Sequence, residues 1–233
     1  MNEFIKAAGC YVKDSTDLGF GGKRFHCRIS QPLEIYVSVV SFDGQLMEYA
    51  INPKINGKFD YVITDDSLYS NSILTADNFK SKKSFLHVNK LEEKKYRKKV
   101  ADDLGAPFNP IRIDTARLAY QVLYDPINEY DYGTSCYDGA EPLGRVAAHY
   151  FSRKKDVTEI RSLISGCNPE GRIYAIELLL TKANDGDVIL TSNDKMLIKK
   201  VIGLDLTIHT CTGCIGQRKK GNEIFSNFLL LLE

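Results

Sequence analysis

Hydrophobic and polar residues alternate along the first third of the chain, which is the pattern of half-buried β-strands. Val, Ile, Phe and Tyr fill many of the apolar positions, as strands favour. Two dipeptides, Asp43-Gly44 and Asn56-Gly57, interrupt the pattern and predict two-residue hairpin turns, because such residues tolerate positive φ angles. We therefore predict a β-rich region built of hairpins, with strands at 24–29, 33–42, 45–51, 58–64 and 85–88.

From residue 90 onward, apolar residues recur every three or four positions, which predicts helices. The clearest case is Asp156–Ala183, which reads as two helices joined by a short turn. Asp156 and Glu159 predict a capping box for the first helix. Asn168, followed by proline, predicts the start of the second. Further helices are predicted at 90–104, 114–123, 142–153 and 193–202, with a strand at 204–209.

These elements predict an α+β fold, with a β-rich N-terminal part at 1–110 and a helical C-terminal part at 111–233. One continuous domain that shares a single core remains open as an alternative. Two helices joined by a short turn are also the unit of α-solenoids, which need three or more stacked units. The chain shows one clear unit. We therefore predict a helical bundle with HEAT-like packing in the C-terminal part.

Two short strings in the C-terminal part carry a resemblance. Gly-Arg-x-Tyr-Ala, with Arg172, Tyr174 and Ala175, lies in the second helix of the pair, and Thr-x-x-Gly-Cys-Ile follows at 210–215. Their pairing resembles that of a group of uncharacterised bacterial proteins, over residues 156–216. The resemblance implies a bacterial helical module, and it carries over no activity and no catalytic residue.

Composition excludes few function classes. A chain of 233 residues with 43% hydrophobic residues can bury a core without a disulfide or a metal ion. The net charge of +1 argues against wholesale binding of nucleic acid. No apolar run approaches the ~20 residues of a membrane helix. With Met1 as the natural start, we expect a cytoplasmic protein; if a signal peptide was removed, the protein is periplasmic or secreted.

Cys211 and Cys214 form the one motif with chemistry in it. A redox Cys-x-x-Cys motif needs a following helix to lower the pKa of the first thiol, and the residues after Cys214 read as a loop. His209 adds a third candidate zinc ligand, but a structural zinc site needs four. We expect a local disulfide or a pair of buried thiols, with no metal ion and no cofactor. An enzyme that uses this pair for thiol-redox chemistry or metal binding is the alternative.

Charge is unevenly distributed along the chain. Residues 80–99 hold nine basic residues against two acidic ones, which favours a solvated helix face and leaves nucleic-acid binding as an alternative. Residues 124–141 hold five acidic residues, four tyrosines and no basic residue. They lack a helix or strand pattern, and so long a loop is uncommon unless it is functional. The other interpretation is that this segment packs on the chain's own basic helix.

Tyrosines give large contact area at low entropic cost, and carboxylates steer a basic partner. We therefore expect a non-enzymatic protein–protein interaction protein, such as an immunity or inhibitor protein that neutralises a basic toxin. We expect no catalytic residue, and neither nucleic acid nor membrane as a partner. The predicted partner-binding residues are Tyr124, Asp125, Glu129, Tyr130, Asp131, Tyr132, Tyr137 and Asp138.

Overall fold

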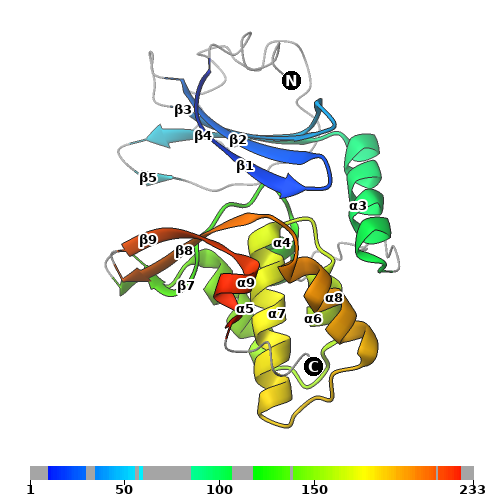
Figure 1. The fold of residues 1–233 in the computed structure, drawn as a ribbon. Coiled ribbons are helices and arrows are strands. Elements are labelled where there is room, and N and C mark those ends of the chain that lie inside the picture. The colour runs from blue at the N-terminus through cyan, green and yellow to red at the C-terminus, as the bar shows by residue number, and fades with distance from the viewer. Residues whose placement is uncertain are drawn as a thin grey trace. The chain divides into compact units, whose positions relative to one another are not determined.

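The computed structural model describes residues 10–29, 35–55, 58–59, 85–106, 118–136, 139–213 and 215–226 (Figure 1). The chain divides into two compact units. The first comprises Met1–Asp17 and Gly21–Tyr96, and the second comprises Leu18–Phe20 and Arg97–Glu233. The division therefore falls inside a helix, earlier than the boundary that the composition predicts near residue 110.

The first unit is built on an antiparallel sheet with the strand order β1-β2-β3-β4-β5, in which β6 also pairs with β4. Asp43 and Gly44 both have positive φ, 46° and 78°, and Phe42 pairs with Gln45 on either side of them. The predicted two-residue turn is confirmed. The strands are β1 (Tyr11–Gly19), β2 (Gly22–Ile29), β3 (Ile35–Phe42), β4 (Gln45–Ile55), β5 (Lys58–Phe59) and β6 (Phe85–Val88).

Apolar side chains from one face of this sheet form its core. Val37, Val39 and Ile51 are buried there, together with Cys27, which forms a disulfide with Cys10. The strand β1 has no counterpart among the predicted strands, because polar residues occupy most of its positions. The predicted turn at Asn56-Gly57 and most of the predicted strand 58–64 lie outside the described residues.

Helix α3 (Lys90–Leu104) has the predicted bounds and the predicted buried stripe of Tyr96, Val100 and Leu104. Asn89 caps it, because its Oδ1 accepts a hydrogen bond from the Leu91 amide at 3.2 Å. Three of its lysines pair with acidic residues on the same helix, which offsets its basic charge: Lys95 with Glu92, Lys98 with Asp102 and Lys99 with Asp103.

The second unit combines helices with a three-stranded sheet. In Figure 1, α5 and α6 lie alongside the long helix α7, and their contacts with α7 agree with this view, while α8 contacts α6. The sheet has the order β7-β8-β9, with β7 parallel and β9 antiparallel to β8. The elements are α4 (Leu118–Tyr124), β7 (Tyr132–Cys136), α5 (Leu143–Ser152), α6 (Thr158–Ile164), α7 (Pro169–Asn184), α8 (Ser192–Ile202), β8 (Thr207–Gly213), β9 (Ile215–Lys220) and α9 (Gly221–Ile224).

The predicted start of α7 is confirmed, but the capping box predicted at the start of α6 does not form. Asn168 accepts a hydrogen bond from the Gly171 amide at 3.3 Å, ahead of Pro169 in the first helical position. Helix α6 begins after Val157, which makes no side-chain cap, and the Asp156 carboxylate accepts hydrogen bonds from the amide and hydroxyl of Thr158, the first residue of the helix. The intended partner in the capping box, Glu159, instead pairs with Lys154 at 2.7 Å.

The structure confirms the α+β class, with an antiparallel sheet first and seven helices later among the described residues. The C-terminal part is less purely helical than its sequence predicts, because it contains β7, β8 and β9. Among the residues that the structure describes, no helix combines the length and the apolar character that crossing a membrane requires.

Candidate functional site

The acidic, tyrosine-rich segment 124–141 begins against the basic helix α3. Tyr124 is the last residue of α4 and is buried. The Arg97 guanidinium lies 4.5 Å from the centre of the Tyr124 ring, and its Nη2 lies 3.3 Å from Asp125 Oδ1. For Tyr124 and Asp125, therefore, the structure agrees with the interpretation that this segment packs on the chain's own basic helix.

Asn168 fixes the turn that follows α4. Its Nδ2 donates hydrogen bonds to the carbonyl oxygens of Asp125 and Asn128, at 3.0 and 2.8 Å. The same side chain caps α7, and it is fully buried. A buried amide that satisfies its donors and its acceptor in this way ties the segment to the start of α7.

The next tyrosines of the segment face inward. Tyr130 is buried, with its ring centre 6.0 Å from that of Tyr174 in α7, and the Tyr132 ring lies 4.9 Å from Tyr174. Gly144 of α5 permits this packing, because a Cβ atom there would collide with the Tyr130 ring. Tyr130 and Tyr132 therefore contribute mainly to internal packing, and the large exposed contact area that their composition predicts is not found there.

Tyr174 also holds the backbone that leads into β7. Burial raises the pKa of Tyr174 to about 12. The hydroxyl accepts a hydrogen bond from the Gly133 amide at 3.1 Å and lies 3.0 Å from the Asp131 carbonyl oxygen, to which it donates. A single side chain of α7 therefore fixes both sides of Tyr132.

Arg145 of α5 supports the same place. Its Nη1 and Nη2 each lie 2.9 Å from a carboxylate oxygen of Glu177, which is a bidentate pair. Its Nε donates to the Gly133 carbonyl at 2.8 Å, and its guanidinium lies 4.8 Å from the centre of the Tyr174 ring. The start of β7 is thus held by charged and aromatic side chains from two helices.

The parallel register of β7 and β8 brings chemistry-bearing residues together. Tyr132 pairs with Thr210, and Gly133 with Cys211. Asp131, one residue before β7, therefore lies level with His209. Side chains two residues apart on a strand share a face, so Cys211 lies on the same face as His209. Sequence spacing predicts the grouping of His209 with Cys211, but not the addition of Asp131.

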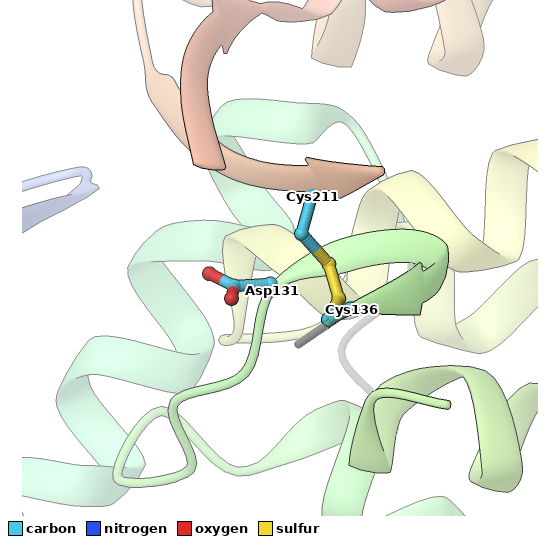
Figure 2. A group of neighbouring side chains, drawn as sticks. All are labelled: Asp131, Cys136 and Cys211. Carbon is cyan, nitrogen blue, oxygen red and sulfur yellow. A yellow bond between two sulfur atoms is a disulfide. The ribbon is translucent and has the colours of Figure 1, made fainter. Parts of the chain in front are cut away.

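Cys211 forms a disulfide with Cys136 across this sheet, with 5.3 Å between their Cα atoms (Figure 2). The expected partner, Cys214, lies outside the described residues. Cys136 is level with Gly213 on β8 and therefore lies on the face that carries Cys211. The sequence expectation of a local Cys211–Cys214 disulfide is corrected in this respect, because strand pairing brings in a residue 75 positions away.

Asp131 lies near the two sulfur atoms, although in the view of Figure 2 its carboxylate points away from the Cys136–Cys211 bond. The ligand atoms of these three residues all lie within 4.8 Å of one another. Burial raises the pKa of Asp131, and so does the negative charge of Glu129, while His209 opposes the rise. The carboxyl is half-buried, whereas both sulfurs are nearly inaccessible, since Cys136 and Cys211 are 6% and 2% exposed.

The remaining predicted partner-binding residues have different settings. Glu129 is exposed. Tyr137 and Asp138 lie outside the described residues. Glu141, at the end of the segment, is exposed, and its Oε1 lies 2.9 Å from His149 Nε2. The described part of this segment therefore presents carboxylates, rather than tyrosine rings, at its surface.

A surface that the charge pattern does not indicate lies on α5. Leu143, Val146 and Tyr150 are 54%, 53% and 47% exposed, although all three are large and apolar. Their spacing of three and four residues places them on one face of the helix, next to the buried Ala147, Ala148 and Phe151. Helical periodicity over 142–153 contains this second stripe, but only the packing shows that it faces outward.

Comparison of the chain with known protein families, with curated proteins and with solved structures finds no match in any of the three.

Proposed function

We propose that this protein is a non-enzymatic protein-binding module, and that its partner docks on the exposed face of α5. The exposed apolar stripe of Leu143, Val146 and Tyr150 is the observation that carries the proposal. Contiguous exposed apolar residues bordered by polar ones are typical of interaction surfaces. Burying what remains exposed of each side chain contributes about 1 kcal/mol, half of the value for full burial.

The border of this stripe favours a partner with basic groups. Glu141 lies just before the first turn of α5, and Glu129 adjoins Tyr130, which packs on Gly144 in that turn. Carboxylates at the border of an interface speed the approach of a positively charged partner more than they add affinity. We propose a basic protein as the partner, and specifically a toxin that this chain neutralises as an immunity protein. This proposal is supported by the charge of segment 124–141, which contains five acidic residues and no basic residue.

We also propose that α6 and α7 form a HEAT-like helical hairpin. Helices α6 and α7 form an antiparallel pair with extensive mutual contacts, which supports a HEAT-like hairpin without a stacked array. The resemblance to uncharacterised bacterial proteins, through Arg172, Tyr174 and Ala175 with the string at 210–215, supports a bacterial origin. In this view α7 acts as scaffold and α5 presents the binding face.

The two disulfides indicate the type of compartment in which the protein binds its partner. Disulfides persist in oxidising compartments and are rare in the cytosol. Cys10–Cys27 and Cys136–Cys211 therefore support the periplasmic or secreted alternative over the cytoplasmic expectation. A toxin met outside the cytoplasm is consistent with that setting.

The test compares a variant of the α5 face with a matched surface variant. Leu143→Ser with Val146→Ser removes the stripe, and Ile189→Ser with Met196→Ser removes two other exposed apolar residues of the second unit. Both variants are used to capture proteins from the native extract and are then titrated against each captured protein. We expect one partner whose affinity falls at least tenfold, or about 1.4 kcal/mol, only with the first variant. Equal affinity of both variants for every captured protein refutes the proposal.

A titration with salt tests the partner's charge. Association with a basic protein slows as salt rises, because screening weakens steering by exposed carboxylates. Glu129→Gln with Glu141→Gln should lower the association rate and leave the dissociation rate nearly unchanged. An association rate that depends neither on salt nor on these two residues removes the basic partner from the proposal.

A further inference from the structure

We propose that the reduced protein binds one zinc ion between β7 and β8, through the side chains of Asp131, Cys136, His209 and Cys211. This site is separate from the proposed docking face on α5. In the oxidised protein the two cysteines are joined to each other, so the disulfide and the metal site exclude one another.

The first support is geometric. The carboxylate of Asp131 and the sulfurs of Cys136 and Cys211 already lie within 4.8 Å of one another. Zinc bonds of about 2.0 Å to oxygen and about 2.3 Å to sulfur imply ligand atoms about 3.3–3.8 Å apart in a tetrahedron. After reduction, side-chain movements on the order of 1 Å bring these three ligands to that spacing.

His209 is the fourth proposed ligand; its ring nitrogens lie outside the group of three whose ligand atoms are all within 4.8 Å of one another, so its side chain has to turn toward them when zinc binds. It is level with Asp131 in the parallel register and shares a face of β8 with Cys211. His209 is also near enough to Asp131 to be one of the groups that shift the pKa of that carboxyl. Two thiolates, an imidazole and a carboxylate make a donor set that suits zinc better than magnesium or calcium, which prefer oxygen ligands.

The surroundings hold these ligands in place. Tyr174 and Arg145 bind the backbone on both sides of Tyr132, which fixes Asp131 relative to β8. Gly133 permits the close approach, because a Cβ atom there would collide with the carbonyl oxygen of Cys211. Such outer contacts orient metal ligands and raise affinity. The two sulfurs are buried, while Asp131 and His209 are partly exposed and leave a path for the ion.

Reduction of the Cys136–Cys211 disulfide frees both cysteines to bind zinc. A dithiol reductant gives two electrons and two protons to the Cys136–Cys211 bond, and the dithiol itself closes to a disulfide. Zinc then displaces the two thiol protons and binds both thiolates, so that two protons are released for each ion bound. Either crosslink joins β7 to β8, and the sheet therefore keeps a covalent or coordinate connection in both redox conditions.

The test uses the full chain, reduced with dithiothreitol and freed of it under argon, with Co²⁺ as a spectroscopic probe. We expect one Co²⁺ per chain, with thiolate charge-transfer bands and the strong visible bands of tetrahedral coordination, displaced by Zn²⁺. About two protons should be released per ion, measured with a pH indicator. The oxidised chain should bind none at this site.

Variants decide which residues hold the ion. Cys136→Ser should abolish the thiolate bands of this site. His209→Ala and Asp131→Ala should each weaken binding by more than the roughly 10–100-fold that loss of an outer contact costs. Cys214→Ser, and Cys10→Ser with Cys27→Ser, are matched controls that should bind as the parent does.

Two results overturn the proposal. One is undiminished tetrahedral Co²⁺ binding by Cys136→Ser, and the other is loss of binding by Cys214→Ser while His209→Ala and Asp131→Ala bind normally. The second result would support the Cys211–Cys214 pair instead. Far-UV circular dichroism checks that each variant is folded. His209→Ala carries the test if the cysteine variants are not, because His209 is partly exposed and its loss opens no core cavity.

Discussion

Removing the Arg145 side chain should destabilise the second unit by about 2–4 kcal/mol. Arg145 makes three charge-assisted hydrogen bonds, two to Glu177 at 2.9 Å and one to the Gly133 carbonyl at 2.8 Å. Hydrogen bonds to charged groups contribute about 1.5–3 kcal/mol each. The sum is discounted because the Glu177 side chain is 23% exposed, so that water hydrates the carboxylate left behind in Arg145→Ala.

Arg145→Lys separates charge from geometry. Lysine keeps the positive charge but cannot bind Glu177 with a planar fork while also reaching Gly133. We expect it to cost about half as much as Arg145→Ala. The matched control is Arg161→Ala, which removes a second bidentate pair, to Asp194, at the same 2.9 Å. The Asp194 side chain that Arg161→Ala leaves without this partner is only 5% exposed, so we expect this loss to cost about 3–5 kcal/mol as well, although it does not act through Gly133.

The assay must report on the second unit alone, because a chain with two units need not unfold in a single cooperative transition. Hydrogen exchange of peptides from α5 and α7, measured by mass spectrometry, gives the free energy of opening for these helices. The expectation for Arg145 is refuted if Arg145→Ala lowers the opening free energy of α5 and α7 by no more than the ~1 kcal/mol of an exposed ion pair. In that case Tyr174, rather than Arg145, carries the connection between β7 and the helices.

Asp194→Asn should destabilise the second unit at neutral pH and not in acid. Burial opposes ionisation of Asp194, but its hydrogen bonds, led by those from Arg161, outweigh burial and hold its pKa below 3.8. Its stabilisation is therefore full above pH 3.8 and lost as pH falls through the folded pKa, which thermal unfolding of both proteins against pH will show. Gly171→Ala should cost about 1–3 kcal/mol, since its Cβ would collide with the Leu123 carbonyl, whereas Gly203→Ala should cost less; comparing their unfolding temperatures checks this.

The features that sequence predicts correctly are those that depend on neighbours within a few residues. The turn at Asp43-Gly44 needs two residues that tolerate positive φ. Helices α3 and α7 are predicted correctly because their sequences contain periodic apolar residues and capping residues. The capping box at Asp156 is the exception. Its residue types are suitable, but Glu159 forms an ion pair with Lys154, and this pair takes the place of the predicted capping box.

The strand β7 escapes prediction because its stability comes from elsewhere in the chain. Its sequence, Tyr-Gly-Thr-Ser-Cys, has little apolar alternation. It forms a strand because β8 pairs with it from about 75 residues away and because Tyr174 and Arg145 bind its backbone. The sequence pattern therefore predicts an exposed loop for the acidic tyrosine-rich segment, although the rings of Tyr130 and Tyr132 pack against Tyr174 of α7.

Gly133 contacts residues from two separate strings of the sequence. Tyr174, from the Gly-Arg-x-Tyr-Ala string, accepts a hydrogen bond from the Gly133 amide, and Cys211, from the later string, pairs with Gly133 across the sheet. Neither string needs to touch the other, because each binds the same residue, which lies about 40 positions before the first. A side chain at Gly133 would collide with Cys211, so the absence of a Cβ there is what lets the helix, the disulfide and the neighbouring Asp131 meet at one point.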